Sequence, residues 1–339
     1  MTKTSLIAYF DKLNIISCFA VILMHHNEIV HYADTSLEVW ASANIINTLC
    51  LFAVPVFFML SGATLLDYRN RYSTKVFFKK RINRAVIPFI VWSVIWLFIS
   101  VFVQHKTSFL NIQGFIDGFI NTKFQSVYWF FFPLFALYLE IPMLSLLAAS
   151  KEGKKVLFFI TIILISFEAI INPLLKGLSI QLNSTFVNGI ALPTLYGILG
   201  YILSTKDIDK LFRYIIYGSS IILLATKIYL STYYPDLNIW SLTDIATLTE
   251  ASAIFIFFKN IKILNNQTLS KIVHQLASFS FGVYLVHILI LYTEKRLISP
   301  YFDVYSFGWR VPMALVTWLL SIGLVLLLKK IPVIGKKIV

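Results

Sequence analysis

Residues 156–164 read Val-Leu-Phe-Phe-Ile-Thr-Ile-Ile-Leu, an apolar run in which polar and apolar side chains do not alternate. A strand of an outer-membrane barrel is about 10 residues long and does alternate, so this run does not fit such a strand. A helix of about 20 mostly apolar residues is long enough to cross the hydrocarbon core of a bilayer. Together with the apolar residues that follow it, the run predicts a membrane-spanning helix over residues 156–174.

The composition of the whole chain agrees with a membrane protein. Of its 339 residues, 58% are hydrophobic and 13% are charged, whereas a soluble domain carries about 25% charged residues. So few charges cannot cover a water-exposed surface of this size. The composition excludes an ordinary cytosolic enzyme, a secreted disulfide scaffold and a disordered tail. Cys18 and Cys50 lie in separate apolar runs without zinc or disulfide spacing, so we expect no metal site.

We predict an all-α polytopic membrane bundle of about ten helices that forms one domain over residues 1–339. No segment between spans is longer than 105–127, so we expect no soluble domain. We also find no Gly-rich phosphate loop. The predicted spans are residues 8–30, 41–66, 85–104, 128–149, 156–174, 186–204, 214–231, 241–258, 276–293 and 308–328.

The basic residues orient these spans. With the N-terminus in the cytoplasm, 22 of the 29 Lys and Arg residues fall on the cytoplasmic side. The positive-inside rule therefore predicts cytoplasmic N- and C-termini and a multi-pass protein of the plasma or inner membrane. The same rule accounts for the net charge of +13 without a nucleic-acid partner. The seven remaining basic residues are Lys106, Lys123, Lys176, Lys227, Lys295, Arg296 and Arg310.

The first span carries a stripe of polar residues. The eleven steps from Asn14 to His25 turn about 1,100°, three turns plus about 20°, so these residues share one helix face about 16 Å apart, with Asp11 close to it. A histidine can serve as a general base near neutral pH, or it can simply hydrogen-bond to a neighbouring helix. We expect His26, about 100° around the helix, at the membrane interface. His287 is predicted at a depth similar to that of His25.

Other ionisable residues in or near the spans are expected to pair or to hydrogen-bond between helices. They are Glu140, Glu168, Asp244 and Glu250. The loop 68–84 is different, because it holds seven basic residues: Arg69, Arg71, Lys75, Lys79, Lys80, Arg81 and Arg84. It is either a topogenic segment that binds anionic lipid or a site for a phosphate-rich ligand from the cytosol. Arg81 and Arg84, at positions i and i+3, lie on one helix face and could both bind a phosphate.

Six short motifs, in this order along the chain, resemble those of the acyltransferase-3 family of integral membrane O-acyltransferases. They are Asp11-Lys-Leu-Asn14 with His25, Val54-Pro-Val-Phe-Phe-Met-Leu-Ser-Gly62, Lys80-Arg81-Ile-Asn-Arg84, Ile87-Pro-Phe-Ile-Val-Trp92, Tyr128-Trp-Phe-Phe-Phe132 with Tyr138 and Pro142, and Ser280-Phe-Gly-Val-Tyr-Leu-Val-His287. The chain resembles the short stand-alone members, which modify envelope polysaccharides or their lipid-linked precursors.

This resemblance implies the transfer of an acyl group, usually acetyl from acetyl-CoA, to a carbohydrate hydroxyl, with no permanently bound cofactor. It implies that His25 is catalytic, that Arg81, Arg84 and Asn14 bind the donor, and that Asp11, Trp129 and His287 line the cavity or the acceptor site. Asn14 replaces an arginine of the family motif, and its amide has no fixed charge. Expected partners are acyl-CoA, the carbohydrate acceptor, the lipid bilayer and either a second copy of the chain or the polysaccharide synthesis machinery.

Two other classes of function stay open. A transporter of polysaccharide or small solutes would also have buried ionisable groups and spans broken by proline. The prolines concerned are Pro55, Pro88, Pro133, Pro173, Pro193 and Pro312. The chain shows no inverted repeat, which argues against this class. A structural partner of a polysaccharide synthase is the second alternative.

Overall fold

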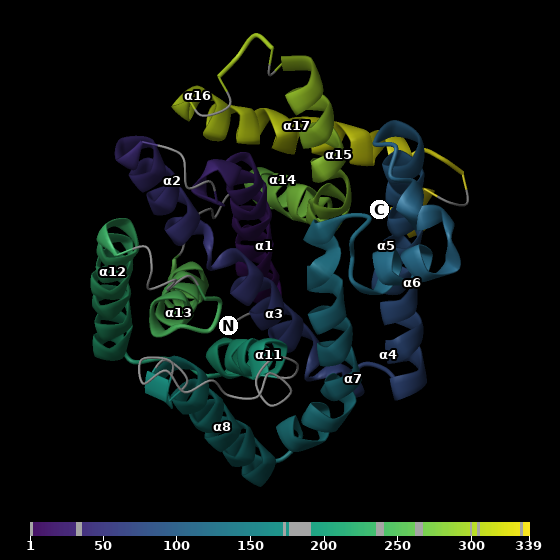
Figure 1. The fold of residues 1–339 in the computed structure, drawn as a ribbon. Coiled ribbons are helices and arrows are strands. Elements are labelled where there is room, and N and C mark those ends of the chain that lie inside the picture. Colours follow the sequence, from purple (N-terminus) through teal and green to yellow (C-terminus); the bar gives the residue numbers. More distant parts are fainter. Residues whose placement is uncertain are drawn as a thin grey trace.

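The computed structural model describes residues 3–31, 36–171, 174–175, 191–234, 241–261, 267–298, 300–303, 306–332 and 335–339. Regular structure in these ranges is entirely helical, which confirms the predicted all-α class (Figure 1). The α-helices are α1 (Lys3–His26), α2 (Leu37–Cys50), α3 (Ala53–Leu65), α4 (Thr74–Arg81), α5 (Ile87–Phe98), α6 (Ile112–Ile120), α7 (Phe131–Ala148), α8 (Lys151–Ser166), α11 (Ala191–Thr205), α12 (Lys210–Tyr233), α13 (Ile245–Asn260), α14 (Gln267–Ala277), α15 (Ser280–Ile298), α16 (Phe307–Arg310), α17 (Pro312–Lys329) and α18 (Gly335–Ile338).

Six helical segments in the described ranges are long and apolar enough to cross a membrane. They coincide with the first, second, third, fourth, seventh and tenth predicted spans, and they cover Ala8–His26, Leu37–Asn70, Thr74–Val103, Ser126–Ala148, Lys210–Tyr233 and Phe307–Lys329. The ninth predicted span, residues 276–293, coincides mostly with α15. α14 precedes it, and the two helices meet at a 57° bend.

The other three predicted spans are helical where the structure describes them, but they do not meet the same criteria. α8 begins with the charged run Lys151-Glu-Gly-Lys-Lys155, α11 is a shorter apolar helix and α13 has 16 residues. Residues 186–190, the start of the sixth predicted span, lie outside the described residues. The total of about ten spans therefore stays a prediction.

The third span begins earlier than predicted, and this corrects the interpretation of 68–84 as a loop. α4 begins at Thr74, where the Ser73 side chain accepts a hydrogen bond from the Val76 N–H, and it runs through a π-helical turn, Ile82–Val86, into α5. Pro88 explains the wider turn, because it has no N–H to donate to the carbonyl four residues earlier and its ring would clash there. Arg81 and Arg84 consequently lie on a helix that continues into the membrane.

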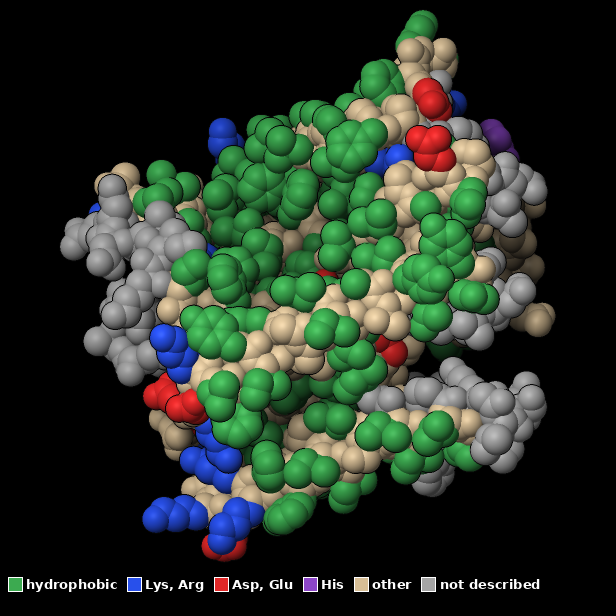
Figure 2. Space-filling model, turned by 90° about the vertical axis from the view of Figure 1, so that its left-hand side faces the viewer, with side chains coloured by type: hydrophobic (Ala, Val, Ile, Leu, Met, Phe, Trp, Pro, Cys, Tyr) green, Lys and Arg blue, Asp and Glu red, His purple; other side chains and the backbone are tan. Residues whose placement is uncertain are grey.

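α1 is the central helix of the bundle and packs against α2, α3, α13, α14, α15 and α17 (Figure 1). α3 and α11 approach each other so closely that a Cβ atom on Gly62 would lie 1.8 Å from the Gly197 carbonyl oxygen. Small residues permit such backbone contact between membrane helices. On the outside, Figure 2 shows apolar side chains over much of one face, with Lys and Arg side chains gathered towards one edge. This distribution fits a lipid-facing surface.

Candidate active site

A cavity of about 590 Å³ opens between α1, α3, α7, the π turn before α5 and the bend between α14 and α15. Four predicted site residues from two distant segments line it together: Asp11 and Asn14 from α1, and Arg81 and Arg84 from the π-turn region. Helix spacing predicts that Asp11 and Asn14 share one helix face and that Arg81 and Arg84 share another. In the fold both faces line this cavity. Its other polar lining residues are Ser61, Thr64, Asn83, Ser278 and Ser280.

The polar stripe of α1 packs along the bend between α14 and α15. Asp11 Oδ2 lies 2.8 Å from His274 Nδ1, and Asn14 Nδ2 donates to the Ala277 carbonyl at 3.3 Å. The backbone at the end of a helix has carbonyl groups without a partner inside that helix. The Asn14 amide binds one of them at the point where an arginine of the family motif would bring a charge. In this chain the α1 stripe thus also holds the bend that forms one wall of the cavity.

The basic segment divides into residues that hold the fold and residues that face the cavity. Arg69 donates to the Ser145 hydroxyl at 2.8 Å, Arg71 donates to the Thr64 carbonyl, and Lys80 lies 3.9 Å above the Tyr72 ring. Arg81 and Arg84 are the basic side chains that line the cavity. Within this segment, therefore, Arg81 and Arg84 are the basic residues placed where they could meet a ligand in the cavity.

Arg81 is held between two aromatic rings. Its guanidinium carbon lies 5.8 Å from the Phe77 ring centre and 5.4 Å from that of Tyr138. The Arg81 Nε atom is buried and has no hydrogen-bond partner in the described part of the chain. Arg84, one turn further on, is exposed. Stacking on aromatic rings fixes the plane of the Arg81 guanidinium, and planar donors of this kind suit a phosphate.

His25 and His287 are neighbours, as their predicted depths allowed. Their ring centroids lie 5.4 Å apart, with His287 fully buried and His25 half-buried. Neither histidine lines the cavity itself. Tyr284 connects them to it, because it is a lining residue and its ring centroid lies 5.7 Å from that of His287. The cavity thus leads from the two arginines to the side of the histidine pair.

The structure places two side chains near the site differently from a simple interfacial or cavity-lining position, and of the two the expectation for His26 is wrong. His26 is not interfacial: it is 3% exposed, and its Nε2 atom lies 2.6 Å from the Thr317 hydroxyl, which in turn donates to Glu294. Trp129 is 41% exposed and does not line the cavity, whereas its neighbour Phe130 does. In both cases the direction of the side chain depends on which helix packs beside it.

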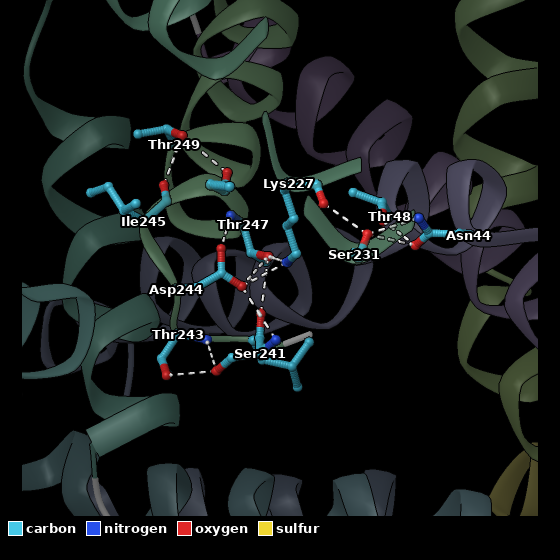
Figure 3. Close-up of polar contacts among 12 residues, drawn as sticks. Asn44, Thr48, Lys227, Ser231, Ser241, Thr243, Asp244, Ile245, Thr247 and Thr249 are labelled. Carbon is cyan, nitrogen blue, oxygen red and sulfur yellow. Dashed lines mark hydrogen bonds and ion pairs between the residues drawn. The ribbon is translucent and has the colours of Figure 1, made fainter. Parts of the chain in front are cut away.

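A buried ion pair joins α12 to the start of α13 (Figure 3). Lys227 Nζ lies 2.6 Å from Asp244 Oδ2 and 2.8 Å from the Thr247 hydroxyl. One turn further along α12, Ser231 bonds to Asn44 of α2 (Figure 3). Pairing of Asp244 was expected, but its partner was not, because the count of basic residues assigned Lys227 to the outer side of the membrane. A lysine flanked by apolar residues was the signal in the sequence.

These features define an all-helical membrane protein with a polar cavity inside its bundle. In the described ranges, no group of three or more His, Cys, Asp and Glu side chains is placed to hold a metal ion. A family model described as an acyltransferase domain matches residues 7–328 of the 339, and the chain therefore belongs to the acyltransferase-3 family. No curated protein and no solved structure matches the chain.

Proposed function

We propose that the protein is a membrane O-acyltransferase that moves an acetyl group from acetyl-CoA to a hydroxyl of a cell-surface polysaccharide or its lipid-linked precursor. The observation that carries the proposal is the cavity, which is lined by Arg81 and Arg84 and also by Tyr284, the neighbour of His287. One continuous space could then hold a donor by its phosphates and bring its acyl end towards His25. Membership of the family supports the acyltransferase class.

The donor site follows from charge. Arginine binds phosphate through charge-assisted, often bidentate hydrogen bonds, so Arg81 and Arg84 would hold the phosphates of acetyl-CoA. Asn14 would add a polar contact to the donor without adding charge. Its Nδ2 also donates a hydrogen bond to the Ala277 carbonyl. The pantetheine arm would then run along α1 from Asn14 to His25, a rise of about 16 Å.

The chemical step assigns a proton transfer to His25. His25 would take the proton of the acceptor hydroxyl while the hydroxyl oxygen bonds to the acyl carbonyl carbon. The carbon–sulfur bond then breaks, and the leaving thiolate takes the proton from His25. A positioned general base of this kind contributes about 10²–10⁴-fold in rate. The other role open to His25 is to support passage of the acyl group towards the outer side of the membrane.

We propose ten spans with both termini in the cytoplasm, so that the donor arrives on the side of Arg81 and Arg84. Single cysteines placed at Lys79 and Lys151 should be labelled from the cytoplasm, and those at Lys123 and Lys295 from outside. The native Cys18 and Cys50 are both buried and provide an unlabelled background. Labelling of the Lys79 position from outside would reverse the whole arrangement.

Purified protein in lipid vesicles, incubated with radiolabelled acetyl-CoA and a host glycan fraction, tests the activity. We expect label to enter carbohydrate, with loss of that label on mild alkaline treatment as for an ester. A transporter or a structural partner of a synthase would leave the label on CoA. The supporting measurement is the acyl content of surface glycans with and without the protein.

A further inference from the structure

His287 is held in one protonation form by the backbone. Its Nδ1 atom lies 2.6 Å from the carbonyl oxygen of Tyr284, one helical turn earlier. A carbonyl oxygen can only accept, so Nδ1 carries the hydrogen. In the neutral ring the other nitrogen, Nε2, then carries the lone pair. His287 is 0% exposed, and Nε2 has no hydrogen-bond partner among the described residues.

The carbonyl that orients His287 is itself fixed. The Tyr284 hydroxyl donates to the Val127 carbonyl at 2.6 Å, and the Tyr128 hydroxyl donates back to the Leu285 carbonyl at 2.7 Å. These two bonds clamp this part of α15 against the short helix Ser126–Phe130 that precedes α7. The ring of His287 therefore has little freedom to turn its lone pair elsewhere.

The neighbouring imidazole is that of His25, with its centroid 5.4 Å away and its plane inclined by 37°. Two imidazoles joined by an N–H···N hydrogen bond have centroids about 5 Å apart, because two ring radii of about 1.1 Å add to a bond of about 2.9 Å. A small rotation of the half-buried His25 ring would close the remaining gap.

We infer that the Nε2 lone pair of His287 accepts a hydrogen bond from His25 and so fixes which nitrogen of His25 is free to take the proton of the acceptor hydroxyl. The inference rests on the proposed function and makes His287 a positioning residue. When His25 takes that proton it becomes a cation, whose second N–H points at the His287 lone pair. The bond strengthens at that moment, and it returns to its former state when His25 gives the proton to the leaving thiolate.

Two substitutions separate this role from a structural one, because each preserves one nitrogen of the ring. His287→Asn places an amide N–H near Nδ1, where it can still donate to the Tyr284 carbonyl. His287→Gln places an amide oxygen near Nε2, where it can accept from His25. If the inference holds, His287→Gln keeps a kcat about tenfold higher than that of His287→Asn, while the KM for acetyl-CoA stays within about twofold of wild type in both.

The control is His105→Gln, which changes an exposed histidine 182 positions before His287 in the sequence. Each kcat is normalised to the amount of folded protein, which is measured by size exclusion in detergent. Equal kcat values, or a higher kcat in His287→Asn, would show that His287 only anchors α15 and would overturn the inference. Absence of transfer by the wild-type protein would instead reject the proposed function, and the inference with it.

A second measurement needs no variant. In wild-type protein with ¹⁵N-labelled histidine, NMR chemical shifts of the ring nitrogens should show that His287 is neutral and protonated at Nδ1. A ring protonated at Nε2 would have no lone pair facing His25, and this result would contradict the proposal independently of any rate.

Discussion

His25→Ala lowers the rate of acyl transfer by about 10²–10⁴-fold, the contribution expected of a positioned general base. The variant should still insert into the membrane, because His25 is only half-buried, whereas its neighbour His26 is buried and contacts the Thr317 hydroxyl. Donor binding should be unchanged, since Arg81 and Arg84 line the cavity and His25 does not. The measurement is transfer of radiolabel from acetyl-CoA to glycan per folded molecule, together with the Kd for acetyl-CoA.

The variant His26→Ala, which changes the next residue in the sequence, is compared with His25→Ala. His26 bonds to Thr317 and lies 3.7 Å from Glu294, so its loss should reduce the amount of folded protein more than His25→Ala does. Per folded molecule, however, we expect its transfer rate within a fewfold of wild type. Full activity of His25→Ala at equal amounts of folded protein would remove His25 from the mechanism and leave His287 as the base.

Helix periodicity was sufficient to find the parts of the site that lie on one helix. Asp11 and Asn14 share a face because 3.6 residues make a turn, and the same holds for Arg81 and Arg84. Both pairs line the cavity. Their roles in donor binding and catalysis are not tested by location and stay predictions.

The bend that completes the cavity could not be predicted in this way. The ninth predicted span begins at residue 276, and the break at 277–280 contains neither proline nor glycine that would indicate a bend there. The chain nevertheless turns by 57° between Ala277 and Ser280, where side chains of α1 bind the backbone. The Asn14 amide donates to the Ala277 carbonyl, and the Cys18 thiol donates to the Ser280 carbonyl at 3.5 Å. A bend stabilised by a helix more than 260 residues earlier has no local signal.

The environment of the charged residue Lys227 could not be predicted from the local sequence either. A count of basic residues per segment assigns each one to a side of the membrane and implies contact with water or lipid headgroups. Lys227 is instead 4% exposed, because its ammonium group donates hydrogen bonds to Asp244 Oδ2 and to the Thr247 hydroxyl at the start of α13 in place of water (Figure 3). The sequence contains both partners, but only the packing of α12 on α13 brings them together.

The double charge reversal Arg81→Glu with Arg84→Glu should weaken acetyl-CoA binding at least tenfold. A hydrogen bond to a charged group contributes about 1.5–3 kcal/mol, although the exposed Arg84 will contribute less than the partly enclosed Arg81 because solvent screens it. Both side chains line the cavity, and carboxylates there would repel the phosphates of the donor. The Kd is measured by titration of acetyl-CoA into protein in detergent, at two salt concentrations. Wild-type affinity should fall as salt rises, because phosphate attraction at a partly exposed site is screened.

Lys75→Glu with Lys79→Glu is the matched control for this reversal. Both lysines lie on the same short helix α4, both are exposed and neither lines the cavity, so the change in net charge is identical. If the segment acts only through topology and anionic lipid, the two double variants should lose function to a similar extent and through reduced insertion. If the cavity binds the donor, the lysine variant should keep its affinity and the arginine variant should lose it while both insert normally. Unchanged affinity in the arginine variant would place the donor phosphates elsewhere, because no carboxylate pair on that wall could leave a bound phosphate undisturbed.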